Sequence, residues 1–381
     1  MAHRPDLAAS GEPERLPPRL TPELIRRAPK VLLHDHLDGG LRPATVIELA
    51  RDLGYRGLPT GDPAELARWF TRGADQGSLE LYLDAITHAV AVIQTPDAIA
   101  RVASECAEDL AADGIVYAEA RFAPELFTQR GLRLDEIMAA AWAGFEEGMR
   151  RADAAGHPIV VRILVTAMRQ ATRSTEVAEL TIRCRDAGVV GFDLAGPEAG
   201  YPPAAHLEAF RLLQRANVHI TVHAGEAVGL PSIHEALELC GAERLGHGVR
   251  IVDDISLDGA GRPVLGRLAS YVRDRRIALE ICPTSNVHTG AVASIPEHPF
   301  DLLERLGFCV TVNTDDRLLS DVSLSSEFGV LVDAFGVDLD RMERMTLDAM
   351  TSSFLPYDQR RALVATVIEP GYARLRAETG P

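Results

Sequence analysis

The chain is 381 residues long and carries 39 basic and 55 acidic side chains, for a formal net charge of −16 at neutral pH. Its 46% hydrophobic and 25% charged residues are typical of a globular protein with a large core, which excludes the disordered and fibrous classes. The acidic excess argues against nucleic acid or an anionic membrane as the main partner. No apolar run reaches the roughly 18 residues that a membrane-spanning helix needs.

The N-terminal segment and the cysteines bear on where the protein works. Residues 1–20 are rich in proline and charge and lack the apolar stretch of a secretory signal, so we expect a short flexible leader before a single domain over residues 21–381. The five cysteines are odd in number and contain no C-x-x-C pair, which predicts neither a disulfide framework nor a thiolate zinc site. We therefore expect a cytoplasmic protein.

Short apolar runs rich in β-branched residues alternate with helical patterns along the chain. Thr95 and Ser174 are predicted N-caps of two helices, and Gly114 and Gly188 lie where helices commonly end. Eight strands alternating with helices predict an α/β fold, a closed (β/α)8 TIM barrel. A doubly wound open sheet is the alternative, although no phosphate-binding glycine motif follows any strand. The predicted strands are residues 31–36, 115–122, 159–168, 189–196, 219–226, 244–248, 277–285 and 309–316.

The first two predicted strands are unusually far apart. The intervening residues 37–114 contain several helical patterns, so we expect a helical insertion after strand 1. Insertions at the carboxyl ends of barrel strands lie over the face where active sites are built, so this one is placed to cover the pocket as a lid. Its Trp69, Phe70, Leu79 and Tyr82 are expected to pack rather than to contact a ligand.

The first strand ends in two histidines, His34 and His36. Because they are two residues apart, a strand points both side chains to the same side. Neutral imidazole nitrogens suit zinc and similar cations. Taken alone, the pair is equally compatible with two hydrogen-bonded polar residues at a strand end.

Three further strands also end in polar side chains. His223 closes the fifth strand, with Glu226 three residues beyond it, and His247 closes the sixth. Asp315 and Asp316 close the eighth. A barrel brings the carboxyl ends of its strands to one rim, so these groups are predicted to form a metal site with the first-strand histidines. Other histidines are expected to have structural roles: His88, His157, His206, His219, His234, His288 and His298.

Several stretches spread along the chain form an ordered series. They are LLHDHLDGG, YAEARFAPELF, ILVTAMR, VVGFDLAG, VHAGEAVG, ERLGHGVRI, EICPTSNVHTGA and VTVNTDD. In this order they resemble the adenosine deaminase family of metal-dependent hydrolases, from about Ala28 to the C-terminal helices. The resemblance implies a purine-salvage enzyme whose partner is a small-molecule purine nucleoside. It would convert adenosine and 2′-deoxyadenosine to inosine and 2′-deoxyinosine plus ammonia.

The resemblance assigns the metal site residue by residue. His34, His36, His223 and Asp315 match the ligands of one catalytic zinc ion per subunit, and His36 also faces the substrate. Related two-metal barrels bridge their metals through a carbamylated lysine at the end of the fourth strand. The only lysine of this chain, Lys30, precedes the first strand, which favours a single metal.

The resemblance also assigns the catalytic groups. Glu226 matches the acid that protonates purine N1, and it must therefore hold a proton through a pKa raised by burial or by a neighbouring negative charge. His247 matches the residue that orients and deprotonates the attacking water, together with Asp315. The residues that match substrate contacts are Asp316 at purine N7, Gly196 at N3 and Asp38 at the ribose hydroxyls.

Two residues beside the pocket depart from the family pattern. Arg317 follows the acidic pair where the family often has proline, and Pro197 follows DLAG where the family often has an acidic residue. Arg317 either meets an anionic substituent or, as we favour, pairs with Asp321 or Glu327 on the surface. Substrate preference therefore stays open: adenine or aminodeoxyfutalosine is the alternative, and a non-catalytic purine-binding barrel is the remaining one. Asp38 favours a nucleoside, because adenine deaminases of the family tend to carry glutamate there.

Overall fold

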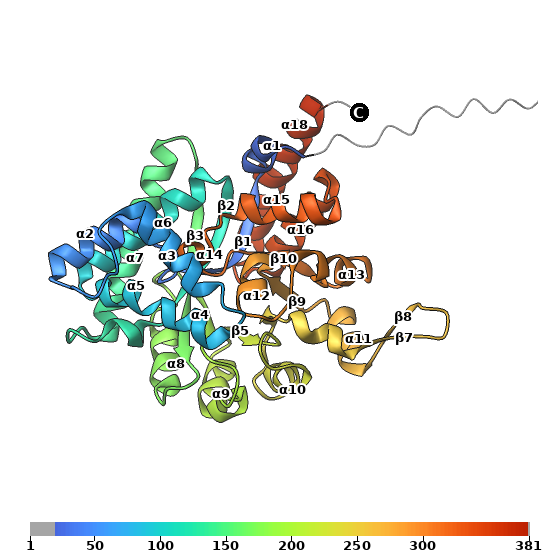
Figure 1. Cartoon of the computed structure of the whole chain (residues 1–381), viewed down its shortest axis with the longest axis horizontal. Coiled ribbons are helices and arrows are strands. Elements are labelled where there is room, and N and C mark those ends of the chain that lie inside the picture. The colour runs from blue at the N-terminus through green and yellow to red at the C-terminus, as the bar shows by residue number, and fades with distance from the viewer. Residues whose placement is uncertain (1–19, 380–381) are drawn as a thin grey trace, which may run out of the picture.

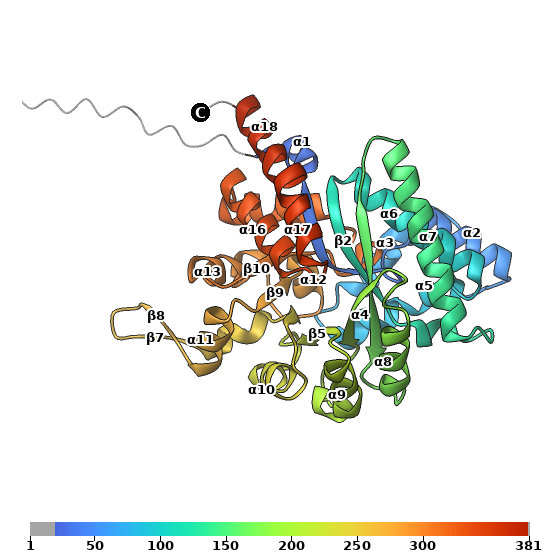
Figure 2. The same cartoon turned by 180° about the vertical axis from the view of Figure 1, so that it is seen from behind.

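Eight parallel strands lie at the centre of the protein, and helices surround them (Figures 1 and 2). The structure, a computed structural model, describes residues 20–379, so the predicted leader lies outside the described residues except for Leu20. The strands pair in chain order, which confirms the predicted (β/α)8 barrel. They are β1 (Lys30–His36), β2 (Ile115–Phe122), β3 (Val160–Met168), β4 (Val189–Ala195), β5 (His219–Ala224), β6 (Arg244–His247), β9 (Ala278–Ile281) and β10 (Val310–Val312).

The barrel closes between β1 and the segment that follows β10. The Asp315 N–H donates to the His34 carbonyl at 3.1 Å, and the His36 N–H donates to the Asp315 carbonyl at 2.9 Å. The Leu33 N–H donates to the Asn313 side-chain oxygen at 3.0 Å. The β1/β10 seam therefore runs through residues that were predicted to hold a metal.

The predicted helix ends are right for α6 and wrong for α8. Thr95 caps α6, because its side chain accepts the Ala98 N–H at 3.2 Å, and Gly114 follows the helix with a φ of 81°. Ser174 is the first residue of α8 rather than its N-cap. The helices that follow the strands on the outside of the barrel, or end the chain, are α6 (Pro96–Ala112), α7 (Leu134–Ala154), α8 (Ser174–Arg183), α9 (Leu207–Arg215), α10 (Leu230–His234), α11 (Arg267–Asp274), α13 (Phe300–Arg305), α15 (Leu324–Phe335), α16 (Leu339–Ser352), α17 (Tyr357–Leu363) and α18 (Glu369–Thr379).

Short helices lie at both ends of the strands and in the long first connection. The last two predicted strands ran too far: β9 ends at Ile281 because Pro283 begins a helix, and β10 ends at Val312, after which only Asp315 forms an isolated bridge, to Asp35. Phe70 is fully buried, as expected for a packing residue. The helices at the ends of the strands and in the first connection are α1 (Pro22–Arg27) before β1, α2 (Pro43–Leu53), α3 (Pro63–Ala74), α4 (Leu79–Ala85) and α5 (Thr87–Val92) after β1, α12 (Pro283–His288) after β9, and α14 (Arg317–Ser320) after β10.

A two-stranded antiparallel hairpin that the sequence did not predict projects from the barrel between β6 and α11 (Figures 1 and 2). It consists of β7 (Ile255–Leu257) and β8 (Pro263–Leu265). Each strand has only three residues, too few to show an alternating pattern.

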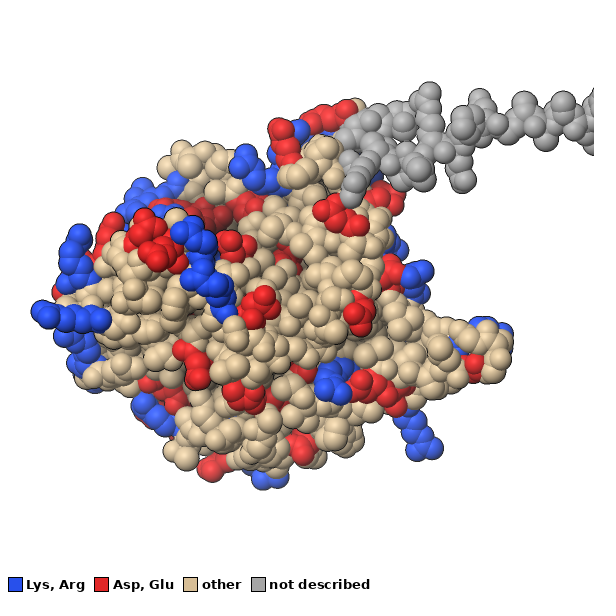
Figure 3. Space-filling model, in the orientation of Figure 1, with Lys and Arg blue, Asp and Glu red and all other residues tan. Residues whose placement is uncertain are grey.

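The surface of the described residues carries both signs of charge. On the face in Figure 3, acidic and basic side chains intermingle, and neither sign covers a continuous area. Between residues 20 and 379, no helix is both long and apolar enough to cross a membrane. All five cysteines are free thiols.

Candidate active site

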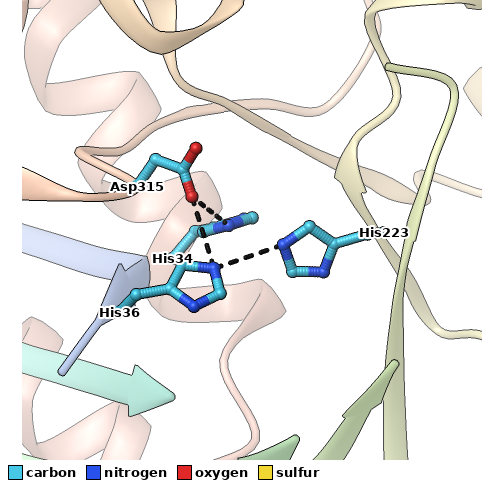
Figure 4. A group of neighbouring side chains, drawn as sticks. All are labelled: His34, His36, His223 and Asp315. Carbon is cyan, nitrogen blue, oxygen red and sulfur yellow. Dashed lines mark hydrogen bonds and ion pairs between the residues drawn. The ribbon is translucent and has the colours of Figure 1, made fainter. Parts of the chain in front are cut away.

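The four residues matched to metal ligands lie together at the carboxyl ends of the strands (Figure 4). His34 and His36 end β1, His223 lies near the end of β5, and Asp315 follows β10. Asp315 Oδ1 lies 3.0 Å from His34 Nε2 and 3.3 Å from His36 Nε2. The Nε2 atoms of His36 and His223 are 3.3 Å apart. Ligands of one tetrahedral ion bound at about 2.0–2.1 Å lie roughly 3.3 Å from one another, so these atoms fit a single metal ion.

Buried carboxylates orient two of the histidines. Glu280 Oε2 lies 3.0 Å from His34 Nδ1, and Asp193 Oδ1 lies 3.0 Å from His223 Nδ1. Because a carboxylate only accepts, each Nδ1 carries the proton and each Nε2 turns its lone pair to the centre of the site. His34 Nε2 is buried and makes no hydrogen bond among the described residues. A cation would satisfy these facing lone pairs.

Two buried arginines hold these carboxylates in their charged form. Arg121 Nη2 donates to Glu280 Oε2 at 2.7 Å, and Arg121 Nη1 lies 3.5 Å from Asp193 Oδ2. Arg244 Nε donates to the other oxygen of Glu280 at 2.7 Å. Burial opposes ionisation, but Arg121 and Arg244 hold the pKa of Glu280 well below its ordinary value. One guanidinium therefore links the carboxylates that orient two metal-binding histidines.

A pocket of about 60 Å³ adjoins the four ligands. The insertion after β1 forms one wall of this pocket, so Leu79 and Tyr82 line it as well as packing in the core. The barrel supplies the other walls. The lining residues are His36, Asp38, Leu79, Tyr82, Leu83, Ile86, Ala123, Leu126, Thr166, Met168, Ala195, Gly196, His223, Glu226, His247, Asp315 and Asp316.

Three carboxyl groups in the lining each have a buried oxygen without a hydrogen-bond partner in the described part of the chain. These atoms are Asp38 Oδ1, Glu226 Oε1 and Asp316 Oδ1. Burial raises the pKa of Asp38 to about 7. Burial, with the negative charge of Asp315 adding to it, raises the pKa of Glu226 and Asp316 well above their ordinary values. Protonated carboxyls can donate hydrogen bonds, so the pocket offers both donors and acceptors to a polar ligand.

The turn that carries Glu226 is fixed by Glu198. The two oxygens of the Glu198 carboxylate accept the backbone N–H groups of residues 225–228 at 2.7–3.2 Å. Pro197, which departs from the family pattern, immediately precedes this residue. An acidic residue, Glu198, is therefore present one position after Pro197, and its carboxylate accepts hydrogen bonds from the backbone of the turn.

Two residues at the rim of the site have a strained backbone. His247 and Asp315 have φ values of 64° and 59°, in the left-handed region that non-glycine residues seldom adopt. Gly196, at the end of β4, has a φ of 109°, and a Cβ there would lie 2.5 Å from Gln170 Oε1. His247 Nε2 lies 3.6 Å from Glu226 Oε2, which places these two side chains side by side.

The prediction that Arg317 pairs with Asp321 or Glu327 on the surface is wrong. The Arg317 side chain is only 11% exposed, and its Nε and Nη2 atoms donate to the two oxygens of Asp35 at 2.7 and 3.3 Å. It does not line the pocket, so it does not meet a substrate substituent there either. A Cβ on Gly40 would lie 2.4 Å from Arg317 Nη2, so this glycine gives the arginine room to reach across to β1.

Several residues that support the site were not predicted from the sequence. Asp193, Glu280 and Arg121 are charged residues inside otherwise apolar strands. A charge in a strand buried on both faces needs a partner, and this signal could have identified them. Glu198 lies in a loop, where an acidic residue carries no such signal.

Comparisons with known proteins identify the family of the chain. The family model described as adenosine deaminase matches residues 29–370. The chain is 58% identical over 371 residues to adenosine deaminase 1 of Streptomyces coelicolor, covering 97% of this chain and 94% of the relative. It is 60% identical over 351 residues to an adenosine deaminase of Mycobacteroides abscessus, covering 92% and 97%.

Solved structures share the fold over most of their length. An adenine deaminase of Arthrobacter aurescens has a TM-score of 0.77 and 25% identity, with 90% of this chain and 98% of that one covered. An amidohydrolase of Burkholderia ambifaria with bound Zn has a TM-score of 0.78 and 25% identity, with 94% of each chain covered. The chain belongs to the adenosine deaminase family.

Proposed function

We propose that this protein catalyses the hydrolytic deamination of adenosine and 2′-deoxyadenosine to inosine and 2′-deoxyinosine, with release of ammonia. The observation that carries the proposal is the set of unpartnered carboxyl oxygens of Asp38, Glu226 and Asp316, beside a four-ligand metal-binding group. The ring nitrogens and ribose hydroxyls of a purine nucleoside can use such donors and acceptors. The names of the relatives from Streptomyces coelicolor and Mycobacteroides abscessus support this reaction.

The family and the ligand cluster make this a metalloenzyme, and we infer that the metal is zinc, one ion per subunit. Three imidazoles and one carboxylate suit zinc, and burial lowers the pKa of His36 and His223, so both are neutral ligands near pH 7. When bound, the metal supplies a water molecule of lowered pKa as the nucleophile. We expect His223→Ala to lose zinc by metal analysis, whereas full occupancy of that variant would contradict the ligand set.

Three carboxyl groups would bind and polarise the substrate. Glu226, kept protonated by burial, donates its proton to purine N1 so that the ring accepts electrons as C6 is attacked. Asp316, protonated for the same reason, donates a hydrogen bond to N7. Asp38 meets the ribose hydroxyls, and the backbone at Gly196 meets N3.

His247 and Asp315 would handle the attacking water. Both line the pocket, and Asp315 also belongs to the ligand cluster, so a water held between them would adjoin the metal. Together they would hold the water while its proton is removed, after which the exocyclic amine leaves as ammonia.

We further propose that the insertion over residues 37–114 is a lid within a single barrel spanning residues 21–381. The pocket volume of about 60 Å³ is well below the roughly 300–1,000 Å³ of ordinary ligand pockets, so the wall formed by Leu79, Tyr82, Leu83 and Ile86 must move to admit a nucleoside. Amide hydrogen exchange over residues 79–86 should slow when purine ribonucleoside is bound. Unchanged exchange there would contradict a closing lid.

The experiment that tests the substrate compares the protein with its Asp38→Ala variant on adenosine, 2′-deoxyadenosine, adenine and aminodeoxyfutalosine. Adenine is included because an adenine deaminase shares the fold. We expect adenosine and 2′-deoxyadenosine to have the highest kcat/KM, and Asp38→Ala to raise KM for both nucleosides. A preference for adenine that Asp38→Ala leaves unchanged would overturn the nucleoside assignment.

A further inference from the structure

A row of hydrogen bonds leads from the outside of the barrel rim to the side of His247 that faces away from the pocket. Asn286 on α12 places its side-chain nitrogen 3.1 Å from His247 Nδ1. Its side-chain oxygen lies 3.3 Å from His298 Nε2 and 3.3 Å from the backbone nitrogen of Cys282. His298 Nδ1 in turn lies 3.0 Å from the backbone nitrogen of Phe300. All three side chains are buried, so solvent does not compete for these bonds.

Two backbone N–H groups determine the direction of every bond in this row. The Cys282 N–H can only donate, so the atom of Asn286 that faces it is the oxygen. The Phe300 N–H can only donate, so His298 Nδ1 is an acceptor without a proton. Burial lowers the pKa of His298 to about 4, so its single ring proton lies on Nε2 and is donated to the same Asn286 oxygen.

The orientation of Asn286 then determines the proton of His247. With its oxygen occupied by two donors, Asn286 turns its NH₂ group to His247 Nδ1. An Nδ1–H at that position would face another N–H at 3.1 Å, which excludes both the Nδ1–H tautomer and the imidazolium. His247 is therefore neutral with its proton on Nε2, the nitrogen that lies in the pocket beside Glu226.

We propose that Asn286 and His298 are positioning residues that hold the proton of His247 on Nε2, so that His247 enters the reaction as a hydrogen-bond donor and Asp315 is the base. The proposal rests on the proposed deaminase function. His247 Nε2–H donates to the oxygen of the attacking water, and that oxygen bonds to C6 as its O–H bond breaks. The proton passes to the Asp315 carboxylate and from there to the leaving NH₂ group, which departs as ammonia. The remaining hydroxyl proton of the adduct returns to Glu226, which had protonated N1.

Neutron diffraction from deuterium-exchanged crystals of the zinc-loaded protein tests the tautomer without any activity measurement. We expect deuterium on Nε2 of His247 and none on its Nδ1, and deuterium on Nε2 of His298. Deuterium on Nδ1 of His247 would overturn the proposal. If the tautomer is as expected but no purine is deaminated, the proposed function fails while the positioning row stands.

Asn286→Asp tests the consequence for catalysis. A carboxylate accepts, so it draws the proton of His247 to Nδ1 and leaves Nε2 as an acceptor. A wrong histidine tautomer costs about 10⁴-fold in kcat in a serine protease, so we expect a loss of at least ~10²-fold here, with KM and zinc content within about threefold of the parent protein. The matched control is Asn217→Asp. Asn217 is exposed and precedes β5 at the opposite end of the barrel, so this variant should keep normal kcat.

His298 gives a graded test of the same row. His298→Gln retains a donor for the Asn286 oxygen and an acceptor for the Phe300 N–H, whereas His298→Ala retains neither. We expect the glutamine variant to recover most of the kcat that the alanine variant loses. An Asn286→Asp protein that has the reversed tautomer and normal kcat would overturn the donor role of His247. Should Asn286→Asp fail to fold, the neutron measurement on the parent protein and the His298 pair still decide the proposal.

Discussion

At the scale of single residues, the proposed chemistry depends on a carboxyl group that keeps its proton at neutral pH. Glu226 lies in a turn whose backbone N–H groups are occupied by Glu198, and its own Oε1 has no partner among the described residues. Burial raises its pKa well above the ordinary value, and the charge of Asp315 adds to this effect. The same side chain exposed to solvent would be ionised and could not donate to a purine nitrogen.

Glu226→Gln should fold normally and keep its metal, because glutamine has the same shape and Glu226 is not a ligand. It cannot transfer a proton, so kcat should fall by about 10²–10⁴-fold, the usual contribution of a general acid. Steady-state kinetics with metal analysis measures both. Glu243→Gln, which alters an exposed partner of His219 at the start of β5, is the matched control and should leave kcat unchanged. Near-normal turnover in the Glu226 variant would contradict the assigned role.

At the scale of elements, the seam between β1 and β10 places metal ligands from two strands in register. Asp35 lies between His34 and His36, and Arg317 follows Asp315 by two residues. The paired Arg317 and Asp35 side chains therefore clamp the two segments that carry three of the four ligands. This pairing could not be read from the sequence, because it depends on barrel closure between β1 and the segment after β10 and on the room that Gly40 leaves for the arginine.

Arg317→Met should weaken this seam. It leaves the fully buried Asp35 without its charged partner, and breaking a buried ion pair costs about 3–5 kcal/mol. We expect a fall of that size in the free energy of unfolding measured with urea, and faster release of metal to a chelator. Arg262→Met, which removes an exposed arginine on the β7–β8 hairpin, is the control and should change neither quantity. Unchanged stability and metal release in Arg317→Met would show that the clamp has no effect.

At the scale of the whole molecule, the barrel could be predicted from the sequence more completely than the residues that hold the site in place. The strands were identifiable because parallel strands buried on both faces are apolar runs, and the proposed ligands stand out because they end those runs. The cap role of Ser174 and the surface pairing of Arg317 were mispredicted because tertiary contacts decide both. The β7–β8 hairpin was missed because its strands are short. His298 was expected to be a routine structural histidine, and only its contact with Asn286 links it to the site.

The single lysine affects the stability of the whole chain. Lys30 is buried and its Nζ donates to three carbonyls at the end of α1, those of Ile25, Arg26 and Ala28, at 2.8–3.1 Å. Burial lowers its pKa from 10.5 to about 8. Between these pH values the unfolded chain binds the proton and the folded protein does not, so this residue makes stability rise with pH.

Lys30→Met removes that dependence. We expect the free energy of unfolding of the parent protein, relative to the variant, to rise by roughly 3 kcal/mol between pH 8 and pH 10.5. The reason is that the pKa of Lys30 is about 2.5 lower in the folded than in the unfolded protein, and each pKa unit corresponds to about 1.36 kcal/mol. Urea unfolding at several pH values measures the difference. A difference that is flat or falls over this range would contradict a folded-state pKa near 8.

We infer that the barrel rim is a metal-dependent adenosine deaminase site. The absorbance at about 265 nm after the zinc-loaded protein is mixed with adenosine tests this inference, with ammonia determined in the same sample. We expect the absorbance to fall and one ammonia to be released for each adenosine consumed. Both changes should be lost when the metal is removed and should return when zinc is restored. Zinc-loaded, folded protein that binds adenosine without changing its absorbance or releasing ammonia would show that the rim is not a deaminase site.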